Sequence, residues 1–222
     1  MRLRIIIGVM KRLGFIIFLT VFVLISACLK SDLVDRSVYD YLQLDVGNEW
    51  IYLDQNGDTV TIRVTDLTYI ASDSAYVLDE DGFLRYWAVH QGQIFELSKF
   101  VAYPEGDEMV IEERYALLME TPFVLGNEWH EFWSTTRHYR DQIFAYSHEV
   151  SGKVSSLIDV LETPAGKFED VYQVEVVDIF RLNDSTWVDT TIMFFAPETG
   201  MVKRIMEGDT LELLDFVEGS AK

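Results

Sequence analysis

The sequence predicts an all-β protein, an antiparallel meander that forms an open barrel or a sandwich. Turn signals recur about every 8 to 15 residues along most of the chain, as they do in antiparallel all-β folds. The runs between these turns are rich in β-branched and aromatic residues, and aromatic residues make up 14% of the chain. No long segment has the apolar period of a helix, so helices are expected to be few.

Residues 1–27 have the pattern of a secretory signal peptide, in which positive charge is followed by a short apolar run and small residues. The cations are Arg2, Arg4, Lys11 and Arg12. The uncharged run covers only residues 13–25, whereas a membrane-spanning helix needs about 20 apolar residues. A signal peptide is therefore favoured over a transmembrane anchor. Translation from Met10 instead of Met1 would give a signal of more usual length.

Cys28 is the only cysteine of the chain, and it directly follows the small residues Ser26 and Ala27. Residues 24–28, Leu-Ile-Ser-Ala-Cys, resemble the bacterial lipobox, which implies lipid on the Cys28 sulfur and cleavage before it. The membrane is thus an expected partner, reached through this lipid. Residues 28–38 are expected to be a lipidated tether. The absence of Asp immediately after Cys28 favours the outer membrane, with the protein facing the periplasm.

The mature chain is strongly acidic. The whole sequence has 18 Lys and Arg against 37 Asp and Glu. Four of the cations lie in the signal, which leaves 14 cations against 37 acids, a net charge of −23. That charge disfavours binding to nucleic acid and electrostatic docking to anionic lipids. A solvated surface explains it, and weak binding of divalent cations is the functional alternative. Residues 39–222 are long enough for a single β-rich domain with its own core.

Alternating apolar and polar residues predict the first strands of this domain. The clearest run is 59–65, and further strands are expected at 75–78, 83–89 and 94–100. Asn56-Gly57 and Asp81-Gly82 each predict a tight type I′ hairpin turn, because these residues tolerate positive φ angles. Residues 112–120 fit either a short helix or the end of a strand.

A five-residue pattern occurs twice, as Val46–Trp50 and as Leu125–Trp129. In both copies Gly-Asn precedes a Trp that begins an aromatic-rich strand. This repeat predicts two related halves, 41–118 and 119–217.

Three short motifs resemble a broad group of uncharacterised bacterial envelope lipoproteins, loosely similar to the DUF3108-like proteins. The motifs lie at 47–52 (GNEWIY), 162–171 (ETPAGKFEDV) and 195–203 (FAPETGMVK). The chain has Ala-Pro-Glu-Thr-Gly where that group usually has Ala-Pro-Gly-Val-Gly, a difference within a turn. The resemblance implies a β-rich fold and a place in the cell envelope. It implies no established reaction and transfers no catalytic residue.

No motif identifies catalytic residues, a metal site or a cofactor. His90, His130, His138 and His148 lack the spacing of a zinc site, and we expect all four at the surface. Ser147-His148 is not a catalytic triad by adjacency alone. Asp79–Gly82 lacks the ligands of an EF-hand loop and is expected to be a charged hairpin tip. Nothing singles out a catalytic pair among the 37 acids.

Aromatic residues are unusually many for a chain of this size, and they either fill a core or line an apolar groove. The candidates are Trp50, Tyr86, Trp87, Trp129, Trp133 and Phe194. Neighbours such as Tyr86 and Trp87 point to opposite faces of a strand, so both faces need a cover of protein or ligand.

The function that follows is a non-enzymatic binding or interaction module of the envelope, with an apolar ligand or an envelope protein as partner. Two alternatives stay open: a carrier or chaperone for lipid or another apolar molecule, and a hydrolase with unidentified carboxylates.

Overall fold

The computed structural model of the chain describes residues 41–70 and 73–219. Contacts divide the chain into Met1–Arg36 and Ser37–Lys222, and every described residue belongs to the second unit. The expected signal peptide at 1–27, the lipid site at Cys28 and the tether at 28–38 lie outside the described residues. In the described part, no helix combines the length and the hydropathy needed to cross a bilayer.

The domain is a single twelve-stranded antiparallel sheet, which confirms the all-β prediction. Its strands are β1 (Glu49–Leu53), β2 (Thr59–Ile70), β3 (Asp73–Glu80), β4 (Phe83–His90), β5 (Gln93–Ala102), β6 (Met109–Glu120), β7 (Glu128–Tyr139), β8 (Gln142–Thr163), β9 (Gly166–Leu182), β10 (Ser185–Ala196), β11 (Gly200–Met206) and β12 (Asp209–Val217). One 3₁₀ turn, η1 (Pro104–Gly106), joins β5 to β6. Residues 112–120 therefore belong to a strand.

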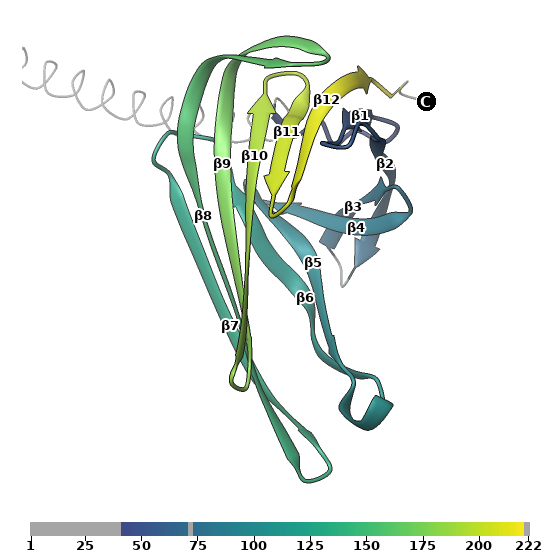
Figure 1. Cartoon of the computed structure of the whole chain (residues 1–222), viewed down its shortest axis with the longest axis vertical. Helices are drawn as coiled ribbons and strands as arrows, with labels where there is room; N and C mark the ends of the chain where they lie inside the picture. Colours follow the sequence, from purple (N-terminus) through teal and green to yellow (C-terminus); the bar gives the residue numbers. More distant parts are fainter. Residues whose placement is uncertain (1–40, 71–72, 220–222) are drawn as a thin grey trace, which may run out of the picture. The chain divides into compact units, whose positions relative to one another are not determined.

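The sheet closes into a nearly complete barrel because its first and last strands pair. Chain neighbours pair throughout β1–β6 and throughout β7–β12, and β1 pairs with β12. The two edge strands, β6 and β7, flank the one seam that no strand ladder closes (Figure 1). Side chains alternate between the lumen and the outside of this barrel. On β11, for example, Arg204 and Met206 lie two residues apart and line the same interior cavity.

One of the two predicted type I′ turns is present. Asp81 and Gly82 both have positive φ, at 48° and 91°, as such a turn requires. The prediction for Asn56-Gly57 is wrong, because only Gly57 has a positive φ there. Asp54 instead organises a wider loop, in which its Oδ1 accepts the N–H groups of Asn56 and Asp58. A side chain that bonds local backbone in this way is a common alternative to the tight turn.

The long β8–β9 hairpin curves over the outside of the barrel (Figure 1). Its tip, Thr163–Gly166, docks on β12, where the Ala165 N–H donates to the Leu213 carbonyl at 2.9 Å. Leu161 and Phe168 of this hairpin pack against the hydrophobic cluster of the domain, to which Phe194 belongs. The second of the three sequence motifs thus includes the tip that docks on β12.

The first copy of the repeated pattern begins the ribbon β1–β3. The Gly47 N–H donates to the Val64 carbonyl at 2.8 Å, and the Val64 N–H donates to the Asn48 carbonyl at 2.9 Å. A β-bulge follows directly after Val64. In this bulge the Thr65 hydroxyl donates to the Val77 carbonyl on β3.

The second copy makes the same contacts at the start of the ribbon β7–β9. The Gly126 N–H donates to the Val154 carbonyl and the Val154 N–H to the Asn127 carbonyl, both at 2.9 Å. A bulge again follows, and in it the Ser155 hydroxyl donates to the Gln173 carbonyl on β9. The repeated five-residue pattern therefore makes the same backbone contacts at the start of both ribbons, β1–β3 and β7–β9. The common origin of the halves 41–118 and 119–217 stays a prediction.

Side chains of β7 bridge the seam. The indole Nε1 of Trp129 donates to the Leu118 carbonyl on β6 at 3.1 Å. The Glu131 carboxylate accepts the Leu117 N–H at 2.9 Å and pairs with Arg114 at 3.0 Å. These bonds replace part of the missing ladder between β6 and β7.

The indole ring of Trp129 packs against the backbone of Gly152 on β8, so Gly152→Ala is expected to destabilise the domain. An added Cβ would lie 2.2 Å from two carbons of the indole ring, which the seam bond holds in place. We expect a loss of about 1–3 kcal/mol in the free energy of unfolding, as for other overpacked cores. Urea unfolding followed by Trp fluorescence measures it. The neighbouring change Ser151→Ala should stay within about 0.5 kcal/mol of the original chain. Equal stability of the two variants would contradict this placement of Trp129.

Candidate functional site

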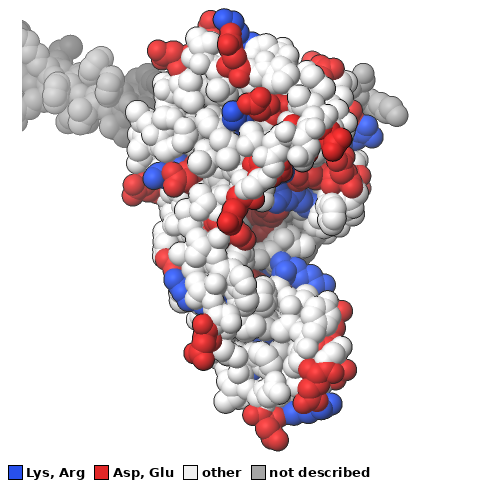
Figure 2. Space-filling model, viewed as in Figure 1, with Lys and Arg blue, Asp and Glu red and all other residues white. Residues whose placement is uncertain are grey.

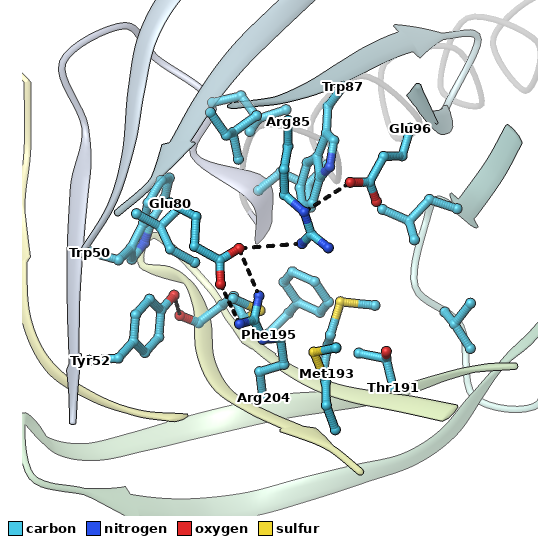
Figure 3. Close-up of a pocket in the computed structure, with 18 of the residues that line it drawn as sticks. Trp50, Tyr52, Glu80, Arg85, Trp87, Glu96, Thr191, Met193, Phe195 and Arg204 are labelled. Carbon is cyan, nitrogen blue, oxygen red and sulfur yellow. Dashed lines mark hydrogen bonds and ion pairs between the residues drawn. The ribbon is translucent and has the colours of Figure 1, made fainter. Parts of the chain in front are cut away.

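The barrel lumen contains a cavity of about 100 Å³ with largely apolar walls. Trp50, Trp87 and Phe195 reach it from three different strands, as Figure 3 shows. Leu78, Met193 and Met201 are among the aliphatic residues that complete its walls. Inward-facing positions of a small barrel are normally filled by such residues, so the charged groups among them need a separate explanation.

A second cavity, of about 190 Å³, adjoins the first. The residues common to both linings are Arg85, Glu96, Leu118, Asp178, Thr191 and Met206. The two cavities are therefore parts of one lumen, and we call the shared part the junction. Figure 2 shows a hollow on one face of the domain in which Lys or Arg atoms lie between Asp and Glu atoms.

Four charged residues form a first ion-pair chain beside the first cavity: Glu96, Arg85, Glu80 and Arg204 (Figure 3). The Nε of Arg85 lies 3.0 Å from Glu96, and its Nη1 lies 3.5 Å from Glu80. Arg204 is only 6% exposed and donates through both Nη atoms to the two oxygens of Glu80. Burial opposes ionisation of Glu80, but the hydrogen bonds and charge of Arg204 outweigh it and lower the Glu80 pKa.

A second ion-pair chain crosses from the seam to the junction: Glu131, Arg114, Glu112, His148 and Asp178. Arg114 pairs with Glu131 at 3.0 Å and with Glu112 at 2.8 Å. His148 lies between two carboxylates, with Nδ1 at 3.1 Å from Glu112 and Nε2 at 3.0 Å from Asp178. Glu112 is fully enclosed, and Asp178 lines both cavities.

The surface position expected for His148 is wrong, because this side chain is 2% exposed. Its ring stacks on Phe180 with a centroid distance of 4.3 Å. Burial by itself disfavours the imidazolium, but the hydrogen bonds that it donates to Asp178 and Glu112 outweigh burial and raise the His148 pKa to about 9. His148 is therefore positively charged at neutral pH.

The other three histidines, His90, His130 and His138, are exposed as predicted. Among the described residues, no group of three or more His, Cys, Asp and Glu is arranged to hold a metal ion.

The structure separates the six predicted aromatic candidates. Trp50 and Trp87 line the first cavity. Trp129 is buried at the seam, and Trp133 lies under the Arg114 guanidinium, 5.3 Å from ring centroid to Cζ. The last two candidates, Tyr86 and Phe194, line neither cavity. The neighbour of Phe194, Phe195, faces the lumen instead.

No protein-family model matches the chain, and no curated protein matches it. Two solved structures resemble it distantly. A “putative lipoprotein” from Parabacteroides distasonis ATCC 8503 is 14% identical with a TM-score of 0.42, over 80% of this chain and 99% of the other. A “putative exported protein with YmcC-like fold” from Bacteroides fragilis NCTC 9343 is 10% identical with a TM-score of 0.41, over the same shares. The DUF3108-like resemblance stays a prediction.

Proposed function

We propose that this chain is a lipid-anchored protein of the bacterial envelope that binds a small molecule in its barrel lumen without catalysing a reaction. The envelope location rests on the signal pattern of residues 1–27 and on Cys28. We place the domain at the outer membrane, facing the periplasm. The observation that carries the binding function is that charged members of both ion-pair chains line a lumen whose remaining walls are mostly apolar.

Stability alone does not account for these charges. Desolvation of buried ions offsets much of their attraction, and well-packed apolar residues of similar size are often as stable or more so. Recognition of a polar ligand does account for them. Apolar cavities with a few fixed polar groups are the usual form of small-molecule sites.

The size of the lumen favours a small ligand over a whole lipid. The two cavities measure about 100 and 190 Å³. An apolar cavity of about 150 Å³ accommodates benzene, and drug-sized ligands occupy pockets of about 300 to 1,000 Å³. An occupant the size of one aromatic ring with a short polar arm fits these volumes, so we favour a small-molecule binding module over an acyl-chain carrier.

The environment of His148 supports binding rather than hydrolysis. Each of its ring nitrogens faces a carboxylate, Glu112 on one side and Asp178 on the other. A protonated ring held in this way has no free nitrogen with which to accept a proton from a nucleophile. His148 therefore acts as a fixed positive charge within the second chain.

A neutral aromatic probe tests the proposal. The full-length protein in phospholipid nanodiscs should bind 2-phenylethanol with a Kd on the order of 1 mM, a normal value for so few atoms. Thr191 lines the junction, whereas its neighbour Thr190 is exposed. Thr191→Phe should fill the junction and weaken binding at least tenfold, and Thr190→Phe should leave it unchanged. Calorimetry, with empty nanodiscs as blank, measures both.

Absence of saturable binding to the original chain, or equal binding to the two variants, would overturn this function. Circular dichroism checks that each variant is folded. Met206→Phe fills the same junction if Thr191→Phe does not fold, because Met206 also lines both cavities.

A further inference from the structure

The two ion-pair chains differ in net charge. The first has two carboxylates, Glu96 and Glu80, and two cations, Arg85 and Arg204, so it is neutral. The second has three carboxylates and two cations and therefore carries one excess negative charge. Its members are Glu131, Glu112, Asp178, Arg114 and protonated His148. Together these nine described side chains leave one carboxylate without a counter-ion.

The two chains end at the junction, where Glu96 and Asp178 both line the lumen. Burial raises the pKa of Glu96, and the negative charges of Asp178 and Glu80 add to this effect while Arg85 opposes it. Both side chains line the same part of the lumen, so each carboxyl group is exposed to the charge of the other. An acidic end of each chain thus lies in the part of the lumen that a ligand would occupy.

A buried donor also faces Glu96. The indole Nε1 of Trp87 is enclosed, and its interaction with the Glu96 carboxylate lowers the pKa of that carboxyl group. Trp87 thus favours the ionised form of Glu96, which is the form that would hold a cation.

The surroundings favour a cation in the same position. Asp189 adds a further, exposed carboxylate to the lining of the second cavity. Trp50, Trp87 and Phe195 supply aromatic surface to the first cavity, which suits both an apolar body and a cation near a ring face. The acidic mature chain would also attract cations and repel anions as they approach.

We propose that the junction binds the ammonium group of a small primary amine, held between Glu96 and Asp178, with its apolar body against Trp50 and Phe195. This inference rests on the proposed function of the lumen. An ammonium group offers three donors and one positive charge, which neutralises the nine-residue network. A carboxylate ligand of equal size would add a second uncompensated negative charge in a poorly solvated site.

Three probes that share one phenyl ring test the inference: 2-phenylethylamine, 2-phenylethanol and 3-phenylpropanoate. Calorimetry on the full-length protein in nanodiscs should give at least tenfold tighter binding for the amine than for the alcohol. The carboxylate should bind more weakly than the alcohol. Glu96→Gln keeps the shape of the side chain and should reduce the advantage of the amine over the alcohol to less than threefold.

Glu149→Gln is the matched control, because Glu149 is also a paired carboxylate but lines neither cavity. It should leave all three affinities unchanged. Asp178→Asn is the second variant if Glu96→Gln does not fold, with the same expected loss of the advantage of the amine over the alcohol. Binding of the alcohol together with equal or tighter binding of the carboxylate would overturn the amine inference and leave the lumen site intact. Failure of all three probes would overturn both.

Discussion

Replacing Glu112 by alanine is expected to lower the free energy of unfolding by about 3–5 kcal/mol, the usual cost of removing one partner from a buried ion pair. Glu112 is the centre of the second ion-pair chain. It accepts hydrogen bonds from Arg114 at 2.8 Å and from the Tyr146 hydroxyl at 2.5 Å, and it pairs with His148. Without it the buried imidazolium keeps a single carboxylate partner, Asp178.

The adjacent residue offers a matched control. Glu113 is exposed on the same strand, so Glu113→Ala should change stability by no more than about 0.5 kcal/mol. Urea unfolding of the two full-length variants measures the difference. If Glu112→Ala and Glu113→Ala have the same midpoint and slope, the second ion-pair chain does not exist as described.

Stability is expected to fall by about 2–3 kcal/mol between pH 7 and pH 10, because His148 loses its proton over that range. The folded state raises the His148 pKa from 6.5 to about 9. A raised pKa stabilises the fold fully below the unfolded value, and this contribution is lost as the pH rises through the folded value. The loss should therefore be concentrated between pH 7 and about 9.

Unfolding in urea at several pH values tests this dependence, with two histidine variants for comparison. His148→Gln should remove most of the slope, because no titrating ring remains between Glu112 and Asp178. His130 is exposed, and His130→Gln should keep the slope of the original chain. A His148→Gln variant with an unchanged slope would assign the pH dependence to other groups.

Local sequence patterns predicted the strands well but did not decide between an open barrel and a sandwich. The alternation at 59–65 and the Asp81-Gly82 turn depend on neighbours in the chain, so both were accessible to prediction. The pairing of β1 with β12 joins residues from opposite ends of the domain, such as Trp50 and Phe216. Pattern alone does not select such a partner, which is why barrel and sandwich stayed open.

The candidate site was predicted only through its aromatic walls. Trp50 and Trp87 were among the candidates because large aromatic residues on strands must cover something. The charged part was missed because the pairs that link its segments join strands far apart in the sequence, as Glu112 on β6 joins His148 on β8 and Glu80 on β3 joins Arg204 on β11. One sequence signal could have predicted that His148 is buried. It lies midway between Tyr146 and Val150 on a stretch of strand in which every second side chain is buried.

The neighbours Phe194 and Phe195 show a second limit of prediction from sequence. Alternation requires them to face opposite ways but does not say which one faces the lumen. Phe194 lines neither cavity and is still buried, so an apolar residue is accommodated on that face of the strand as well. The lumen residue was therefore Phe195, which had not been selected.

The most direct test of ligand binding in the lumen is to locate a bound probe by nuclear Overhauser effects. The sample would be full-length protein in nanodiscs with 2-phenylethylamine at a saturating concentration. We predict effects from the probe ring to the indole protons of Trp50 and Trp87 and to the methyl group of Met193. Effects confined to exposed aromatic residues such as Tyr69, Phe83 and Trp187 would place the probe on the surface and contradict a ligand site in the barrel.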